Sequence, residues 1–390
     1  MKVVPPFCFL NSNDQSALLG TGEGPAFVVH SLEDLSSLDA FLDLHRGTYI
    51  FGFLSYALQA HVTGVPLSGE LSLPLAYFWV PQSVGAVRDA RIDEVKCGNK
   101  HMLEALLAQI NSAKEIPLPP FRTLVGKEEY FESVNYIKEK IQRGDLYETN
   151  FCIEYFIENL AIDDLFGLYQ RVNSRTQAPF SALLHLEYLW LACGSPERFM
   201  KKTGNTLFSQ PIKGTSARFE HREIDQQSRE RLANSSKEKS ENVMIVDLVR
   251  NDLSKIATPG SVHVDELCGV YTFPTVHQMI STISCHIEDS CSFSAILKAM
   301  FPMGSMTGAP KRNALLFAQE LERFTREIYS GSVGYFTPEG DFDFNVVIRS
   351  LEYYPHKKRL ACGVGSAITM ASDPAQEYEE CDMKIKRLIH

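Results

Sequence analysis

The chain has 390 residues, of which 44% are apolar and 22% are charged. This composition is typical of a folded globular protein with a sizeable core, and it excludes extended disorder. The formal net charge of −10 argues against nucleic acid as a partner, although local cations or a metal could still bind an anionic substrate.

Nine cysteines are scattered along the chain, and no two of them form a Cys-x-x-Cys pair. An odd number of dispersed cysteines is typical of reduced thiols rather than of a disulfide framework. The N-terminal apolar stretch is interrupted by two prolines and lacks a signal cleavage region, and no later run is long enough to span a membrane. We therefore expect a cytoplasmic protein with no membrane partner.

Short apolar runs separated by Gly, Pro and Ser clusters dominate the first part of the chain. This pattern predicts strands joined by turns, followed by one helix, and we interpret residues 1–113 as a β-rich N-terminal subdomain. The predicted strands are Ala26–Val29, Thr48–Phe53 and Leu75–Val80, and the predicted helix is His101–Ser112.

The segment KEIPLPP, residues 114–120, is rich in proline. Proline lacks a backbone N–H and clashes with the preceding helical turn, so this segment cannot continue the helix before it. We predict that it is a linker and that residues 121–390 form a second, larger domain.

In the second domain, apolar residues at helical spacing predict a helix over Lys127–Arg143, with Gly144 at the C-cap. Strands and helices then occur in blocks, which favours an α+β fold with antiparallel sheets over a doubly wound parallel sheet. The other predicted strands are Phe151–Ile157, Ala182–Leu186, Leu189–Cys193, Thr206–Ser209, Ser261–Cys268, Gln278–Ile287, Gly331–Phe336, Phe344–Tyr353 and Arg359–Cys362. The other predicted helices are a polar stretch over His221–Leu253, one that Pro310 opens, and Pro374–Ile389.

Lys213 lies in the segment PIKGT, residues 211–215, between a rigid proline and a flexible glycine. A lysine amine is a nucleophile only when it is neutral, so this role requires a site that lowers its pKa from about 10.4. A lysine that ends a strand and pairs with a surface carboxylate is the simpler interpretation of Lys213 alone. The accompanying motifs have to decide between the two.

Two predicted helices each carry glutamates three residues apart, Glu238 with Glu241 and Glu377 with Glu380. Side chains at this spacing emerge on one face of a helix. Two such pairs could together hold Mg²⁺, which keeps several waters and takes further oxygens from its substrate. Solvated helices carry the same spacing, so neither pair is decisive by itself.

Three further features could carry chemistry. Glu197 follows a predicted strand, and a carboxyl group there acts as a general acid if an apolar setting raises its pKa; an exposed turn glutamate fits equally well. The glycine-bearing loop at residues 301–311 leads into a helix whose first amides could attract an anion. Arg349 could bind a carboxylate through two hydrogen bonds, whereas a histidine such as His277 is more often a core group.

Together these segments resemble the chorismate-utilising enzymes, from about Phe121 to the C-terminus. The resemblance implies an α+β fold of two facing antiparallel β-sheets with helices packed outside, to which the N-terminal strands are added. The motifs that carry it are SPE at 195–197, PIKGT at 211–215, ENVMIVDLVRND at 241–252, FPMGSMTGAPK at 301–311, SGSVGYF at 330–336, DFNVVIRSL at 343–351, GVGSAI at 363–368 and SDPAQEYEE at 372–380.

Lysine at position 213 resembles the family members that aminate chorismate at C4, on the route to para-aminobenzoate and folate. Members that make anthranilate, isochorismate or salicylate usually carry alanine there. The resemblance implies that the Lys213 amine attacks C2 of chorismate while the C4 hydroxyl leaves, with Glu197 as general acid. Ammonia would then add at C4 and expel the lysine.

The resemblance also implies a Mg²⁺ ion that Glu241 and Glu380 hold against the ring carboxylate, with Glu238 and Glu377 behind them or holding its waters. It further implies a set of residues that bind the substrate. These are Thr215, His277, Ser305, Tyr329, Arg349, Gly363 and Gly365.

Glu148 stands where the family more often has glutamine, and Leu18-Leu19-Gly20 departs from a tract associated with tryptophan binding, so we do not expect tryptophan feedback. No segment resembles a glutaminase, so we expect ammonia from solution or from a separate glutamine amidotransferase subunit. Two alternatives stay open: formation of anthranilate on the same scaffold, and a catalytically silent chorismate-binding subunit.

Overall fold

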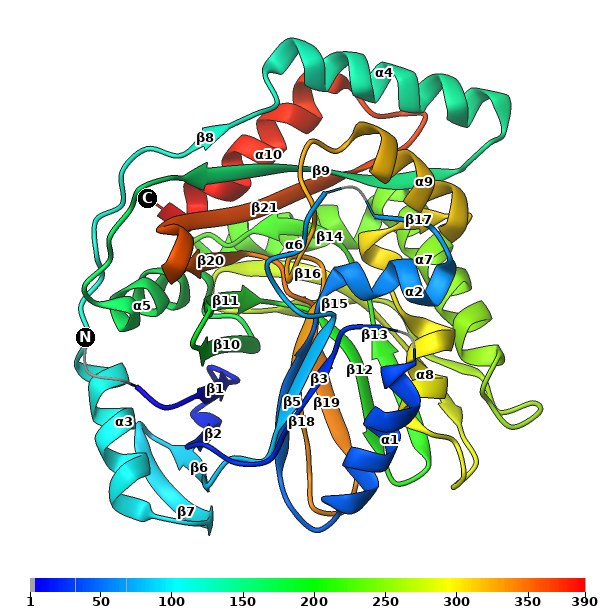
Figure 1. The fold of residues 1–390 in the computed structure, drawn as a ribbon. Helices are drawn as coiled ribbons and strands as arrows, with labels where there is room; N and C mark the ends of the chain where they lie inside the picture. The colour runs from blue at the N-terminus through cyan, green and yellow to red at the C-terminus, as the bar shows by residue number, and fades with distance from the viewer. Residues whose placement is uncertain (1–3, 32, 68, 390) are drawn as a thin grey trace.

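The computed structural model describes residues 4–31, 33–67 and 69–389. Within these residues the chain forms two antiparallel β-sheets that face each other, with helices on their outer sides (Figure 1). The predicted α+β class with two facing antiparallel sheets is confirmed.

The first sheet has eleven strands among the described residues. In spatial order they are β17 (Gly308–Ala309), β9 (Glu148–Ile157), β21 (Arg359–Ile368), β20 (Ser350–Tyr354), β11 (Leu189–Ser195), β10 (Phe180–Leu186), β1 (Phe7–Asn11), β2 (Ser16–Thr21), β6 (Ser83–Arg88) and β7 (Arg91–Cys97), with β8 (Arg122–Thr123) beside β9.

The second sheet has ten strands within the same described ranges. Their order is β14 (Ile212–Ala217), β16 (Val276–His286), β13 (Thr206–Gln210), β12 (Arg198–Thr203), β19 (Phe342–Asn345), β18 (Ser332–Phe336), β4 (Ile50–Leu54), β5 (Ala76–Trp79) and β3 (Ala26–Val29), with β15 (His263–Thr272) beside β16.

Helices cover the outer sides of both sheets, and α4 and α10 lie along β9 and β21 in Figure 1. In the described part of the chain, none combines the length and the apolar content that crossing a bilayer requires. The helices are α1 (Asp34–Leu44), α2 (Gln59–Thr63), α3 (Lys100–Ser112), α4 (Lys127–Arg143), α5 (Leu165–Thr176), α6 (Arg222–Asn234), α7 (Ser236–Ser254), α8 (Phe293–Met300), α9 (Lys311–Leu321) and α10 (Pro374–Ile389), with short 3₁₀ turns η1 (Tyr56–Leu58), η2 (Gly304–Met306) and η3 (Pro355–Lys357).

The N-terminal strands belong to both sheets. β1 pairs with β10, so that Phe7 lies opposite His185, and β4 pairs with β18, so that Gly52 lies opposite Gly334. Residues 114–120 form neither helix nor strand. The division into an N-terminal subdomain, a linker and a catalytic domain stays a prediction, and the strands on either side of the linker share their sheets.

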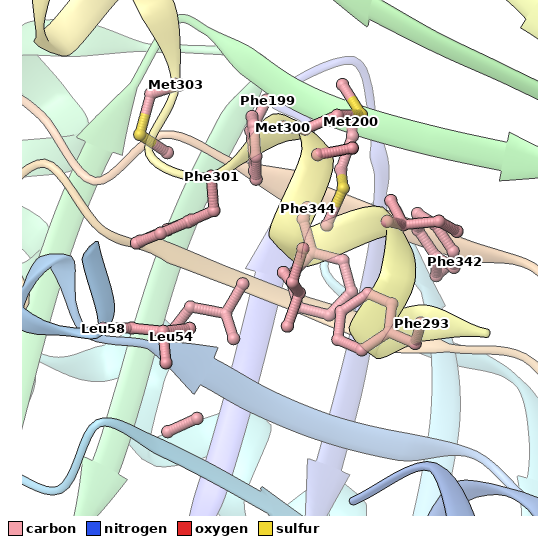
Figure 2. Packing of buried hydrophobic residues seen from close by; sticks show 14 of the residues in the cluster. Leu54, Leu58, Phe199, Met200, Phe293, Met300, Phe301, Met303, Phe342 and Phe344 are labelled. Atoms are coloured by element: carbon pink, nitrogen blue, oxygen red, sulfur yellow. The ribbon is translucent and has the colours of Figure 1, made fainter. Parts of the chain in front are cut away.

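Three apolar layers hold the fold together. One fills the space between the two sheets, where Phe51 and Trp79 meet Leu184 and Leu191. A second packs α3, α4, α5 and α10 against the first sheet. The third packs α1, α7 and α8 against the second sheet, and Figure 2 shows its aromatic centre. The labelled side chains there include Phe199, Met200, Phe293, Met300, Phe342 and Phe344.

Two predicted elements are interrupted in the structure. The predicted strand 344–353 is split into β19 and β20, which belong to different sheets, because the chain crosses between the sheets over residues 346–349. Arg349 adopts a φ of 53° at this crossing. The predicted polar helix 221–253 is likewise two helices, α6 and α7, that meet at Ser235, whose hydroxyl caps α7.

Candidate active site

A cavity of about 400 Å³ brings the predicted site residues together. Its walls come from β14 of the second sheet, β21 of the first sheet, α7, α10 and the turn η2. Every predicted site residue except His277 lines it. These residues are Glu197, Lys213, Thr215, Glu238, Glu241, Ser305, Tyr329, Arg349, Gly363, Gly365, Glu377 and Glu380.

A bulge in β14 carries Lys213 to the cavity. The register between β14 and β16 shifts between Ile212 and Thr215, and a bulge of this kind redirects a side chain. Gly214 lies inside the shift with a φ of 88°, and a Cβ atom at this position would come within 2.9 Å of a carboxylate oxygen of Glu238. Glycine is therefore required at this position.

Lys213 forms a buried ion pair with Glu148. Its Nζ donates a hydrogen bond to Oε1 of Glu148 at the start of β9, and the two side chains are only 10% and 2% exposed. Burial by itself lowers the pKa of Lys213, but the negative charge and hydrogen bond of Glu148, with Glu241 and Glu197 nearby, outweigh burial and raise it. The expectation that this site lowers the pKa of Lys213 is wrong, because a buried carboxylate stabilises its ammonium form.

Glu197 lies in the short turn between β11 and β12 and is 4% exposed. Its backbone is held on both sides, since its N–H donates to the Ser195 hydroxyl over 3.2 Å and its carbonyl accepts from Val346 over 3.0 Å. Burial raises the pKa of Glu197 to about 7. A carboxyl group with this pKa is partly protonated near neutral pH, which suits a general acid.

The two predicted glutamate pairs face the same cavity from α7 and α10. Glu241 is buried, and Lys237 lies 3.9 Å from its Oε1. Burial raises the pKa of Glu241 to about 7, and the charge of Glu148 adds to this effect. Glu380 is half exposed and pairs with Lys384 over 2.6 Å.

These carboxylates fit a hydrated divalent cation. Among the described residues, no three His, Cys, Asp or Glu side chains converge closely enough to hold a metal by themselves. Mg²⁺ needs no such group, because it keeps several waters and uses one or two carboxylates with substrate oxygens. Glu241 and Glu380 could supply those oxygens. The raised pKa of Glu241 marks a buried carboxylate whose charge a cation would stabilise.

Another part of the cavity lining is suited to a carboxylate ligand. Arg349 lines the cavity, and among the described residues its guanidinium group forms no direct ion pair, although the charge of Glu380 acts on it through space. A Cβ atom at Gly363 would come within 2.3 Å of the Tyr329 ring, so glycine allows this ring to pack on β21. Lys384 donates to the carbonyl of Gly365 over 2.6 Å. Arg349 thus offers a cation, and Tyr329 an aromatic surface, beside β21.

His277 does not line this cavity, in contrast to its predicted role. Its two ring nitrogens lie 2.9 Å from Oγ1 of Thr272 and 3.0 Å from Oδ1 of Asp225. Its neighbour Gln278 does line the cavity, opposite Thr215 in the ladder between β14 and β16. Successive side chains of a strand point to opposite faces, so the two neighbours cannot share the site.

Gln278 is the functional candidate that motif reading missed. It is 3% exposed, and its Oε1 has no hydrogen-bond partner among the described residues. If the register between β14 and β16 had been known, Gln278 would have been identified as the residue that pairs with Thr215.

The sequence of the chain matches the model of one known protein family. The model of the chorismate binding enzymes matches residues 11–390. The chain is a member of the chorismate binding enzyme family. The resemblance carried by the motifs is thereby confirmed over almost the whole chain, including most of the N-terminal strands.

Several curated proteins are similar to this chain in sequence. Aminodeoxychorismate synthase component 1 of Klebsiella aerogenes is 37% identical over 270 residues, 69% of this chain and 59% of that protein. The protein of the same name from Escherichia coli K12 is 36% identical over 263 residues, 67% of this chain and 57% of its own. The chain thus spans less than two thirds of these relatives. An anthranilate synthase component I-like protein of Synechocystis is 29% identical over 371 residues, which are 92% of this chain and 75% of that protein.

Solved structures of chorismate binding enzymes share the fold. Anthranilate synthase component I from Streptococcus pneumoniae superposes with a TM-score of 0.77 at 20% identity, over 100% of this chain and 91% of that one. The menaquinone-specific isochorismate synthase of Escherichia coli superposes with a TM-score of 0.75 at 18% identity, over 100% of this chain and 90% of that one. At these identities the likeness establishes the two-sheet architecture and nothing about the reaction.

Proposed function

We propose that this protein aminates chorismate at C4 to give 4-amino-4-deoxychorismate, as the names of its curated relatives indicate for them. The observation that carries the proposal is the position of Lys213. It enters the cavity that Glu197 also lines, at a position where family members that make anthranilate usually carry alanine. The product would serve para-aminobenzoate and folate synthesis.

In the proposed mechanism, Arg349 holds a carboxylate of chorismate and Lys213 attacks C2 of the ring. The C2–N bond forms as the C4–O bond breaks, the ring double bond shifts, and Glu197 protonates the hydroxyl that leaves as water. Ammonia then adds at C4, the double bond returns, and the lysine amine leaves C2. Burial keeps Glu197 partly protonated at neutral pH, as this role demands.

We propose that Glu241 and Glu380 hold Mg²⁺ during this reaction, with Glu238 and Glu377 beside them. When bound, the ion would neutralise a carboxylate of the substrate and so help to hold the substrate in the cavity. Glu241, which is buried, and Glu380, which is half exposed, line the same cavity and would otherwise repel a dianionic ligand.

We propose a separate glutamine amidotransferase subunit as the source of ammonia, since the relatives are named as one component of a synthase. Free ammonium would replace it in vitro. A cytoplasmic location is proposed as well, because all nine cysteines are unpaired thiols.

Product analysis tests this proposal. Purified protein is incubated with chorismate, Mg²⁺ and ammonium, and the products are identified by mass spectrometry. We expect 4-amino-4-deoxychorismate without release of pyruvate. Pyruvate with a fluorescent aromatic product would instead support the second candidate, an anthranilate synthase, which the similarity to the Synechocystis protein favours. Binding of chorismate without turnover would identify a silent subunit and contradict both enzymatic functions.

A further inference from the structure

The Lys213–Glu148 pair has a feature that the proposed mechanism leaves unused. Oε1 of Glu148 accepts the hydrogen bond from Lys213, while Oε2 is buried and has no hydrogen-bond partner among the described residues. A buried carboxylate with one idle oxygen is costly to maintain unless it has a role. The ammonium form of Lys213, which this pair stabilises, is also the form that cannot attack chorismate.

The backbone around Glu148 is held rigidly from the neighbouring loop. Glu148 lies opposite Ala309 in the pairing of β9 with β17. On either side of it, Tyr147 donates to the Ala309 carbonyl over 2.7 Å and Asn150 donates to the Thr307 carbonyl over 2.6 Å. The loop at residues 301–311, whose helix-start amides were expected to attract an anion, thus fixes the backbone of Glu148 in place.

The other described carboxylates around Lys213 do not contact its amine directly. Glu197 and Glu241 both act on it through space, from the end of β11 and from α7. Among the described residues, however, Glu148 is the carboxylate that accepts a hydrogen bond from Nζ, and neither partner of the pair is bonded to the four glutamates of α7 and α10. Within the described ranges, a proton that leaves Nζ therefore has Glu148 as its one directly bonded carboxylate acceptor.

We infer that Glu148 is the proton acceptor for Lys213, an inference that rests on the proposed amination of chorismate. One N–H bond of the ammonium group breaks, the proton moves to the Glu148 carboxylate, and the freed electron pair of Nζ forms the bond to C2. Glu197 gives its own proton to the departing hydroxyl and later takes one from ammonium as that becomes ammonia. When the lysine amine leaves C2, Glu148 returns its proton to Nζ. The cycle consumes chorismate and ammonium and releases the aminated product and water.

The variant Glu148→Gln tests this role, because an amide keeps the shape and a hydrogen-bond acceptor but cannot take a proton. In this variant Lys213 must lose its proton to solvent. At pH values below the pKa of Lys213, the fraction of neutral lysine therefore grows tenfold for each pH unit. We measure kcat for both proteins with saturating chorismate and ammonium, from about pH 6 to about pH 9. Taking the ratio of wild-type to variant kcat cancels the titration of Glu197, which both share.

We expect the ratio to be about 10² near neutral pH and to shrink as the pH rises. A ratio that is constant with pH, or equal to one, would overturn the inference, since a purely structural role gives no pH dependence. Glu148→Asp, which keeps a carboxylate, should show a pH-independent ratio. Glu154→Gln is the matched control on the same strand. Glu154 pairs with Arg359 outside the cavity, and its loss should leave kcat unchanged.

A second measurement separates this inference from the proposed function. Acetic anhydride modifies neutral amines, and peptide mass spectrometry reports how fast Lys213 is labelled near neutral pH. We expect faster labelling in Glu148→Gln than in the wild type, because the ammonium form loses its counter-charge. Equal labelling would contradict the role of Glu148 even if amination is observed. Faster labelling without any aminated product would support the pair and contradict the proposed reaction.

Discussion

Gln278 lies directly opposite Thr215 in the ladder between β14 and β16, and both residues line the cavity. The strand next to Lys213 therefore contributes a polar group that no motif identified. Because Oε1 of Gln278 has no protein partner in the described part of the chain, we expect it to accept a hydrogen bond from a bound ligand.

Replacing Gln278 tests this contact. Gln278→Leu keeps the approximate volume but removes both polar atoms, so we expect kcat/KM for chorismate to fall about tenfold, which is about 1.4 kcal/mol. Steady-state kinetics measure the loss. An unchanged kcat/KM would show that Gln278 does not contact the substrate.

We expect His277, in contrast to Gln278, to contribute to stability and not to substrate binding. His277→Phe keeps a buried ring but loses the hydrogen bonds to Thr272 and Asp225, so the free energy of unfolding should fall by about 1–3 kcal/mol. The KM for chorismate should stay within about twofold of wild type. Urea denaturation and kinetics are measured together. A loss of chorismate affinity at unchanged stability would restore the role that motif reading assigned to it.

Glu197 predicts a pH limit on the reaction. A general acid works in its protonated form, and burial raises the pKa of Glu197 to about 7. As the pH rises through this value the carboxyl group loses its proton, so kcat should decrease on the alkaline side. Glu197→Gln should lose this limb and about 10²–10⁴-fold in kcat. A wild-type profile that is flat across neutral pH would argue against Glu197 as the acid.

Removal of the metal should abolish turnover. We expect a chelator to stop product formation and Mg²⁺ to restore it. Glu241→Gln and Glu380→Gln should each raise the Mg²⁺ concentration for half-maximal activity by at least about tenfold. Glu379→Gln, on the same helix but outside the cavity lining, is the matched control. Full activity in the presence of chelator would exclude the proposed Mg²⁺ dependence.

Local signals predicted some elements closely. The helix Lys127–Arg143 has the predicted bounds, and Gly144 ends it in the left-handed conformation expected of a C-cap glycine. Both features depend on neighbouring residues, namely apolar periodicity and a positive φ. The predicted strand 344–353 failed because its interruption depends on contacts with distant segments. Val346 donates to the carbonyl of Glu197, and Val347 donates to that of Gly331.

In the site, too, local sequence signals identified some residues and missed others. The motifs identified Lys213, Glu197 and the two glutamate pairs. They did not identify Glu148 as the ion-pair partner of Lys213. Glu148 is 65 residues away along the chain and on the other sheet, and the sequence marked it only as an unusual residue. The raised pKa of Lys213 follows from that contact, so it could not be predicted before the strands were placed.

The rate of 4-amino-4-deoxychorismate formation by Lys213→Ala, with saturating ammonium and Mg²⁺, tests the central claim most directly. If the Lys213 amine forms the bond to C2, this variant should be slower than wild type by about a thousandfold, or about 4 kcal/mol. Formation of the same product at the wild-type rate would contradict the account.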